Sequence, residues 1–397
     1  MRNHALIYCI LVWGLGASPG SWAAPRLPIV QANKTATWKL ERGGQITVQN
    51  PGGEVLIQGW DQESVEAVAT RQGKTFDVGV SQESANHLLI APSPRSASGV
   101  RLEIKLPRYA EIKSVESREN VKVVGVSGAV RVHSSSGNLE FQQVGPLSAA
   151  TSSGDIRVDG VTGRIEVSTS SGDVQIRQTG SAEAKTNSGD ITVTDAGGAV
   201  TVRSGSGKIT ARNIGGDLLV KTTSGEVVAE NIKGLVNASS TSQGISVRNA
   251  DGDVKVGSIS GDVRLECVKG RAESNTVSGS ISLTGVGGDI EASTTSGDVR
   301  FDGELRPSGR YRLKSFSGEA RMDLGGSVPG FTATLSTYSG EIDTDFALTV
   351  ESPERQGAVN RRLVGRFGDG QAQISLESFS GEIQLKKGAA GKTANCK

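Results

Sequence analysis

A four-residue phrase, serine-glycine-acidic-apolar, recurs along this chain at a nearly constant interval. With the imperfect copies included, its glycine position advances in steps of 17 or 18 residues from Gly137 to Gly297. A fixed interval of this length is typical of a solenoid, in which each repeat forms one coil stacked on the last. The complete copies contain Ser153 and Gly154, Ser171 and Gly172, Ser188 and Gly189, Ser224 and Gly225, Ser260 and Gly261, and Ser296 and Gly297.

The composition agrees with a thin, repetitive core. Glycine accounts for 53 of 397 residues, about twice the usual share of roughly 7%, and aromatic residues make up only 4%. The charges balance to a net of +1 with both signs interspersed, which argues against a nucleic-acid or anionic-membrane partner.

Apolar residues alternate on both sides of each glycine. In one repeat, Ile165 and Val167 precede Gly172, and Val174 and Ile176 follow it. Since side chains of a strand point alternately to opposite faces, each repeat contributes two short strands with one inward face. The sequence therefore predicts an all-β protein, a parallel β-solenoid with about 18 residues and two strands per coil.

The domain limits follow from where this interval is regular. Irregularly spaced strand patterns over residues 34–112 predict an N-terminal β cap, and residues 113–303 form the regular solenoid. Residues 304–387 are expected to form irregular C-terminal coils, with an insertion near 348–367 that carries Arg361, Arg362 and Arg366. Residues 388–397 are expected to be a disordered tail.

The phrase itself is interpreted as a corner of the coil. Extending the alternation backward places the serine before the glycine, and the Ser or Thr two residues earlier, on the inward face, where hydroxyl ladders would satisfy them. The glycine is expected to need a positive φ, and the acidic residue to face solvent. A second ladder is expected at the opposite corner from Asn213, Asn231 and Asn249, with Cys267 in the next coil.

The outward position two residues before the glycine becomes apolar toward the C-terminus. Two interpretations stay open: the 348–367 insertion covers this stripe, or the stripe binds a partner. Its apolar members are Ile259, Val277, Phe316, Tyr338 and Phe379.

The N-terminus has the pattern of an exported protein. Residues 1–23 are expected to be a signal peptide, with an apolar run and a small-residue cleavage site, and residues 24–33 a linker. No later apolar stretch is long enough to cross a bilayer. The mature chain would keep Cys267 and Cys396, which permit one disulfide without requiring it.

No motif predicts catalysis, a metal or a cofactor. Residues 204–208 lack the spacing of a phosphate loop, and the acidic corners lack that of calcium-binding β-rolls. His87 and His133 are the only histidines after the expected signal peptide, which argues against a histidine-ligated metal or a Ser-His pair.

Three stretches resemble a known bacterial family. They are Leu40 to Gly44 with Val55 to Asp61, the repeated Ser-Gly-Asp-Ile/Val phrases, and the closing Ser380-Gly381-Glu382-Ile383. Together they resemble the glycine-rich β-solenoids called putative adhesins, a domain family of unknown function. The resemblance implies a β-solenoid fold and a link to the cell envelope, and it implies no catalytic or binding residues.

The sequence is therefore interpreted as an exported, non-enzymatic structural or adhesin-like module of the bacterial cell envelope, periplasmic or on the cell surface. Its expected partner is an unknown envelope protein or glycan. Two alternatives stay open. One is a carbohydrate-active β-helix enzyme, which predicts a cleft of clustered carboxylates and basic residues. The other is an envelope scaffold that assembles by self-association.

Overall fold

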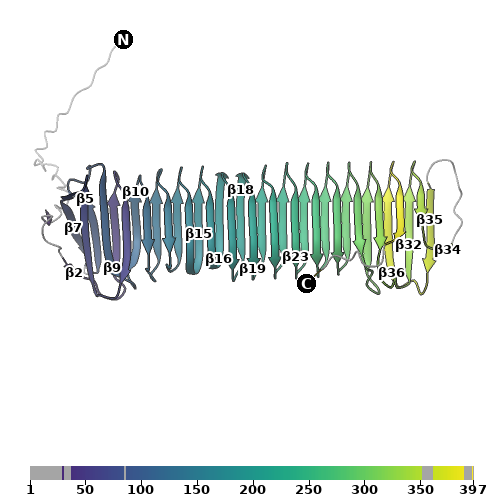
Figure 1. Ribbon diagram of the computed structural model, residues 1–397, viewed down its shortest axis with the longest axis horizontal. Helices are drawn as coiled ribbons and strands as arrows, with labels where there is room; N and C mark the ends of the chain where they lie inside the picture. Colours follow the sequence, from purple (N-terminus) through teal and green to yellow (C-terminus); the bar gives the residue numbers. More distant parts are fainter. Residues whose placement is uncertain (1–28, 31–36, 85, 351–360, 389–395, 397) are drawn as a thin grey trace, which may run out of the picture.

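The protein is a long rod of stacked β-coils (Figure 1). The computed structural model describes residues 29–30, 37–84, 86–350, 361–388 and 396. Every regular element in this part of the chain is a β-strand, and the strands form a parallel solenoid of about 12 turns with about 18 residues per coil. The predicted fold class is thereby confirmed. The expected signal peptide lies outside the described residues, and no helix within them is long and apolar enough to span a membrane.

Two sheets run the length of the rod, and β15 and β16 contribute to both. In spatial order, the first sheet contains β8 (His87–Pro92), β3 (Gln45–Asn50), β10 (Glu111–Ser117), β12 (Val130–Ser134), β14 (Leu147–Thr151), β15 (Ile156–Thr169), β16 (Val174–Ser188), β18 (Val200–Ser206), β20 (Leu218–Thr222), β22 (Val236–Ser240), β24 (Val254–Ser258), β26 (Ala272–Thr276), β28 (Ile290–Thr294), β30 (Arg310–Ser315), β36 (Ala372–Ser378) and β32 (Phe331–Thr337). The second contains β5 (Ser64–Arg71), β9 (Val100–Pro107), β4 (Val55–Trp60), β11 (Val121–Val124), β13 (Leu139–Gln142), β15, β16, β17 (Ile191–Ala196), β19 (Ile209–Ile214), β21 (Val227–Ile232), β23 (Ile245–Ala250), β25 (Val263–Val268), β27 (Ile281–Val286), β29 (Val299–Gly303), β31 (Ala320–Leu324), β37 (Ile383–Lys387) and β33 (Ile342–Thr344).

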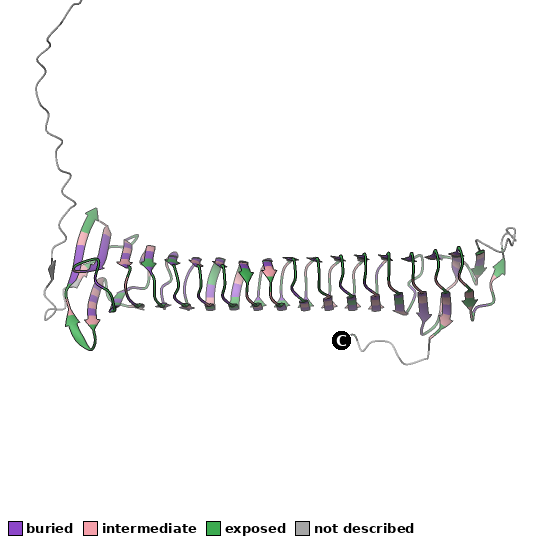
Figure 2. Cartoon of the chain, turned by 90° about the horizontal axis from the view of Figure 1, so that it is seen from above, coloured by how far each residue is buried: buried purple, intermediate pink, exposed green. Residues whose placement is uncertain are grey.

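The core is one thin layer of side chains between these sheets. Figure 2 shows the two layers of strands edge-on, with buried residues along both. Along most strands of the regular coils the buried residues alternate with more exposed ones, as in β12 and β20. Valine, isoleucine, leucine and alanine fill most inward positions of the regular coils, so equivalent side chains stack at the inter-strand spacing of about 4.8 Å. The largest fully buried side chains are Tyr311, Phe141, Phe301 and Phe331.

Antiparallel strands close the N-terminal end of the solenoid. Strand β7 (Val78–Ser84) pairs with β8 and with β1 (Ile29–Val30). In the second sheet, β5 pairs with β9, β2 (Thr37–Lys39) and β6 (Lys74–Phe76). Residues 29 and 30, expected in a linker, thus belong to the cap. Since these strands cover the first coil, its edges are not left open to another chain.

At the C-terminal end the coils stack in a different order from their order in the sequence. We call this rearrangement the strand exchange, and the repeat does not predict it. The chain first forms β32 and β33, then the antiparallel strands β34 (Thr349–Val350) and β35 (Arg361–Phe367), and then β36 and β37. In space, β36 lies between β30 and β32, and β37 lies between β31 and β33. The last coil in sequence is therefore inserted beneath the terminal one, and β35 covers the outer edge of β32.

Candidate functional site

The two hydroxyl positions of the corner point in opposite directions. Thr151, Thr169 and their equivalents, three residues before the glycine, are buried, whereas the serines directly before the glycine, such as Ser171, are exposed. The prediction that these serines face inward is wrong, because strict alternation ends where the chain bends. Most of these buried hydroxyls donate to the backbone of the coil below, as Thr169 Oγ1 does to Gly154 O at 3.1 Å, instead of forming the expected hydroxyl ladder.

The corner glycine is required by close stacking rather than by its φ angle. A Cβ on Gly154 would collide with the carbonyl group of Gly137 in the coil below, and the same clash recurs along the corner. Only some corner glycines, such as Gly189 and Gly297, have a positive φ (151° and 145°). The predicted need for a positive φ is therefore wrong for most copies.

The acidic residue after the glycine has a structural role besides being solvent-exposed. Asp173 N donates to Asp155 Oδ1 at 3.1 Å, and Asp190 N donates to Asp173 Oδ1 at 2.8 Å. These carboxylates thus satisfy backbone donors that the turn leaves without a ladder partner.

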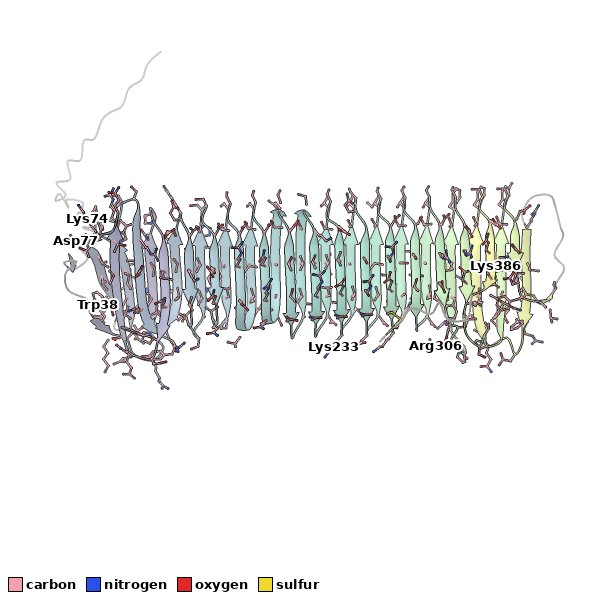
Figure 3. The ribbon with its side chains drawn as sticks, viewed as in Figure 1. Trp38, Lys74, Asp77, Lys233, Arg306 and Lys386 are labelled. Carbon is pink, nitrogen blue, oxygen red and sulfur yellow. A yellow bond between two sulfur atoms is a disulfide. The ribbon has the colours of Figure 1, made fainter. Side chains whose placement is uncertain are left out.

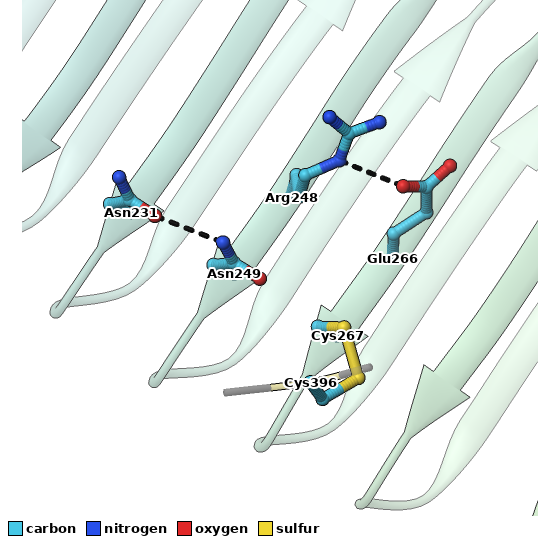
Figure 4. Close-up of a disulfide and its surroundings, with 6 residues drawn as sticks. All are labelled: Asn231, Arg248, Asn249, Glu266, Cys267 and Cys396. Carbon is cyan, nitrogen blue, oxygen red and sulfur yellow. Dashed lines mark hydrogen bonds and ion pairs between the residues drawn. A yellow bond between two sulfur atoms is a disulfide. The ribbon is translucent and has the colours of Figure 1, made fainter. Parts of the chain in front are cut away.

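A second ladder at the opposite corner ends in a disulfide (Figure 4). Asn231 Nδ2 donates to Asn213 Oδ1 at 2.9 Å, and Asn249 Nδ2 donates to Asn231 Oδ1 at 3.0 Å. All three residues have a φ near +57°, which asparagine tolerates well. Cys267 occupies the next slot, with a φ of 57°, and its sulfur is bonded to that of Cys396.

This disulfide joins residues 129 positions apart in sequence, with a Cα–Cα distance of 5.3 Å. The structure describes two residues of the tail that was expected to be disordered, Gly388 and Cys396, and both are attached to the rod. Cys396 forms the disulfide, and Gly388 N donates to Leu324 O at 2.7 Å. The residues between them lie outside the described part of the chain.

The C-terminal part of the apolar stripe is a stack of three aromatic rings. Phe379 lies between Phe316 and Tyr338, with ring centroids 4.7 Å apart on each side and planes within 3° of parallel. This order follows from the strand exchange, since Phe379 comes last in sequence. The rings cover one another's faces and present their edges to solvent.

The stripe is exposed in the described residues. Ile259, Val277, Phe316, Tyr338 and Phe379 are between 44% and 51% exposed. The described part of the insertion forms β34 and β35, which cover the edge of β32 instead of the stripe. Of the two interpretations, intramolecular cover therefore finds no support in the described residues.

A groove of about 680 Å³ lies on the outer face of the first sheet, over β28, β30, β36 and β32. Arg271, Asp289, Glu291, Arg310 and Arg312 form one side, while short polar side chains of β36 and β32 form its floor. Arg306, labelled in Figure 3, lies just before β30 in the chain and donates a hydrogen bond to Asp289 Oδ1 at 2.9 Å. The repeat pattern does not predict this groove, because its floor depends on the strand exchange.

The carboxylates in this groove are paired with cations. Glu291 lies 2.8 Å from Arg271, and Glu377 lies 3.9 Å from Lys314. Burial by itself would raise the pKa of Asp289, but the Arg310 amide and the guanidinium groups of Arg306 and Arg310 outweigh it and leave that pKa below its ordinary value. A general acid needs a raised pKa, so this arrangement is better suited to binding than to acid catalysis.

A raised carboxyl pKa occurs elsewhere, at the Ser-Gly corner of the irregular coils. Burial raises the pKa of Glu319, with Arg321 acting in the opposite direction, and Glu319 Oε1 is buried without a hydrogen-bond partner. Asp323 nearby is bound by Arg321 at 2.8 Å and by Arg300 at 3.0 Å. Among the described residues, no three His, Cys, Asp or Glu side chains meet in a way that could hold a metal ion.

A match to a known family model supports the architecture. The Toastrack DUF4097 family model matches residues 31–254 and 216–386. A solved structure of a putative cell adhesion protein from Clostridium sporogenes is 9% identical, with a TM-score of 0.17, covering 89% of this chain and 99% of that one. A putative adhesin from Bacteroides fragilis is 10% identical, with a TM-score of 0.14, covering 91% of this chain and 98% of its own. No curated protein matches. Since the family model spans most of its length, this chain belongs to the Toastrack DUF4097 family of β-solenoids.

Proposed function

We propose that this protein is an exported, non-enzymatic, adhesin-like rod that acts at the bacterial cell envelope. The observation that carries the proposal is the Cys267–Cys396 disulfide. Disulfides form and persist in oxidising compartments outside the cytosol and are rare inside it. The signal-peptide pattern of residues 1–23, which the structure does not describe, supports the same location.

The faces of the rod favour a binding role over a catalytic one. Outward charges are paired between neighbouring coils, as in Arg212 with Glu230 at 2.7 Å and Arg248 with Glu266 at 2.8 Å. Such ladders give long, regular surfaces. The aromatic stack of Phe316, Phe379 and Tyr338 interrupts this regularity with exposed apolar edges, and we assign it to contact with an envelope component.

The test combines cell fractionation with thiol chemistry. The full chain is expected in the envelope or secreted fraction with Cys267 and Cys396 blocked to alkylation, whereas a variant lacking residues 1–23 is expected in the cytosol with both thiols reactive. A full-length chain found reduced and cytosolic would refute the proposal.

Self-assembly into a scaffold is a separate proposal with less support. Antiparallel strands cover the terminal coils at both ends, which is a common way to prevent coil-on-coil stacking. Sedimentation velocity over a wide concentration range tests it, because a scaffold requires concentration-dependent oligomers.

A further inference from the structure

Two basic strands flank two strands of short polar side chains at the C-terminal end of the first sheet. Across this sheet the order is β30, β36, β32 and β35. On the outer face β30 presents Arg310, Arg312 and Lys314, and β35 presents Arg362 and Arg366. Three inter-strand spacings separate these strands, a distance of about 14 Å.

The floor between them offers hydroxyl and amide groups. Register places Arg312 beside Ser375, Ser375 beside Thr334, and Thr332 beside Arg366. These floor side chains are shorter than the arginines, so the surface is hollowed there into the groove of about 680 Å³. A volume of this size is typical of sites for small organic ligands.

The electrostatics leave positive charge available. The acidic residues in the groove, Asp289, Glu291 and Glu377, already have basic partners. Within the part of the chain that the structure describes, neither Arg312 nor Arg366 forms an ion pair with an acidic side chain. Arg312 therefore lines the groove, and Arg366 lies beside the floor residue Thr332, so both guanidinium groups are available to an anionic ligand.

We propose that this groove binds an acidic oligosaccharide. Arginine matches carboxylate geometry with two parallel hydrogen bonds, so Arg312 and Arg366 each bind a sugar carboxylate. Floor hydroxyl and amide groups both donate and accept, and so they match sugar hydroxyls. Among the described residues that line the groove, Tyr311 is the one aromatic residue, and it is buried, so these residues offer no ring to stack on a nucleic-acid base. This inference rests on the proposed function, since it names the ligand class of an envelope-facing rod.

The test measures binding of the full-length mature protein to three probes by calorimetry: an oligogalacturonate, a neutral galacto-oligosaccharide of equal length, and inorganic polyphosphate. The variant carries Arg312→Gln and Arg366→Gln together. The control carries Arg264→Gln, which replaces an exposed arginine of β25 in the second sheet. Melting curves that match the parent protein establish that each variant is folded.

We expect the parent and the control to bind the oligogalacturonate more tightly than either other probe. The double substitution is expected to weaken that binding at least tenfold. The proposal is overturned if the oligogalacturonate does not bind, if the neutral sugar binds equally well, or if the double variant retains affinity. Equal binding of polyphosphate would also overturn it, since only general charge attraction would then remain. The fractionation experiment tests the proposed function independently of calorimetry. If the protein is found in the envelope but does not bind the oligogalacturonate, the glycan site is refuted and the proposed function is not.

Discussion

Removing the Cys267–Cys396 disulfide should loosen the C-terminal coils selectively. The bond closes a loop of 129 residues that contains every coil after β25. In the chain-entropy model, a loop of this length restricts the unfolded segment by about 5 kcal/mol at 25 °C. Unfolding a segment of this size carries an entropy of roughly 0.27 kcal/mol per kelvin, so its melting temperature should fall by up to about 18 °C.

The assay is thermal unfolding followed by circular dichroism, together with hydrogen exchange resolved by segment. The perturbed protein carries both Cys267→Ser and Cys396→Ser, so that no lone thiol remains, and the reduced parent protein is its control. Because coils contact mainly their neighbours, exchange should accelerate after β25 and stay unchanged between β12 and β20. Equal melting temperatures with and without the bond, or protection lost uniformly along the rod, would refute the reasoning.

Three further predictions concern the corners. Gly154→Ala should destabilise its coil by about 1 to 3 kcal/mol, because the new methyl group meets the backbone below, and urea unfolding measures this. Thr169→Val should cost about 1 to 2 kcal/mol through the lost bond to Gly154 O, whereas Ser171→Ala, at the exposed position, should change stability by less than about 0.5 kcal/mol; equal effects would contradict the assigned directions. Since burial raises the pKa of Glu319, the folded state retains a proton that the unfolded chain has released. Stability should therefore fall as pH rises from the ordinary glutamate pKa through the raised one. Glu319→Gln should remove this part of the slope in urea midpoints measured between pH 4 and 7, and an unchanged slope would count against the assignment.

The local sequence determines the regular coils almost completely. The recurring phrase and the period-two alternation correctly place the strands on both sides of Gly172. This is possible because each regular coil packs against neighbouring coils with nearly the same sequence pattern. The asparagine ladder follows from the same repetition, since equivalent residues stack at one spacing. The direction of Ser171 could not be inferred in this way, because alternation describes a strand and does not extend through a bend.

Only the tertiary structure decides the order of the last coils. The sequence reads β30, β32, β36, whereas the structure stacks β30, β36, β32 and then adds β35. Repeats that are nearly alike pair equally well with several neighbours, so their pattern does not fix which coil lies next to which. That order places Phe379 between Phe316 and Tyr338 and brings Arg366 beside the groove floor. The partner of Cys267 is likewise decided in three dimensions, because Cys396 lies 129 residues away in sequence and yet is bonded to Cys267 at the end of the asparagine ladder.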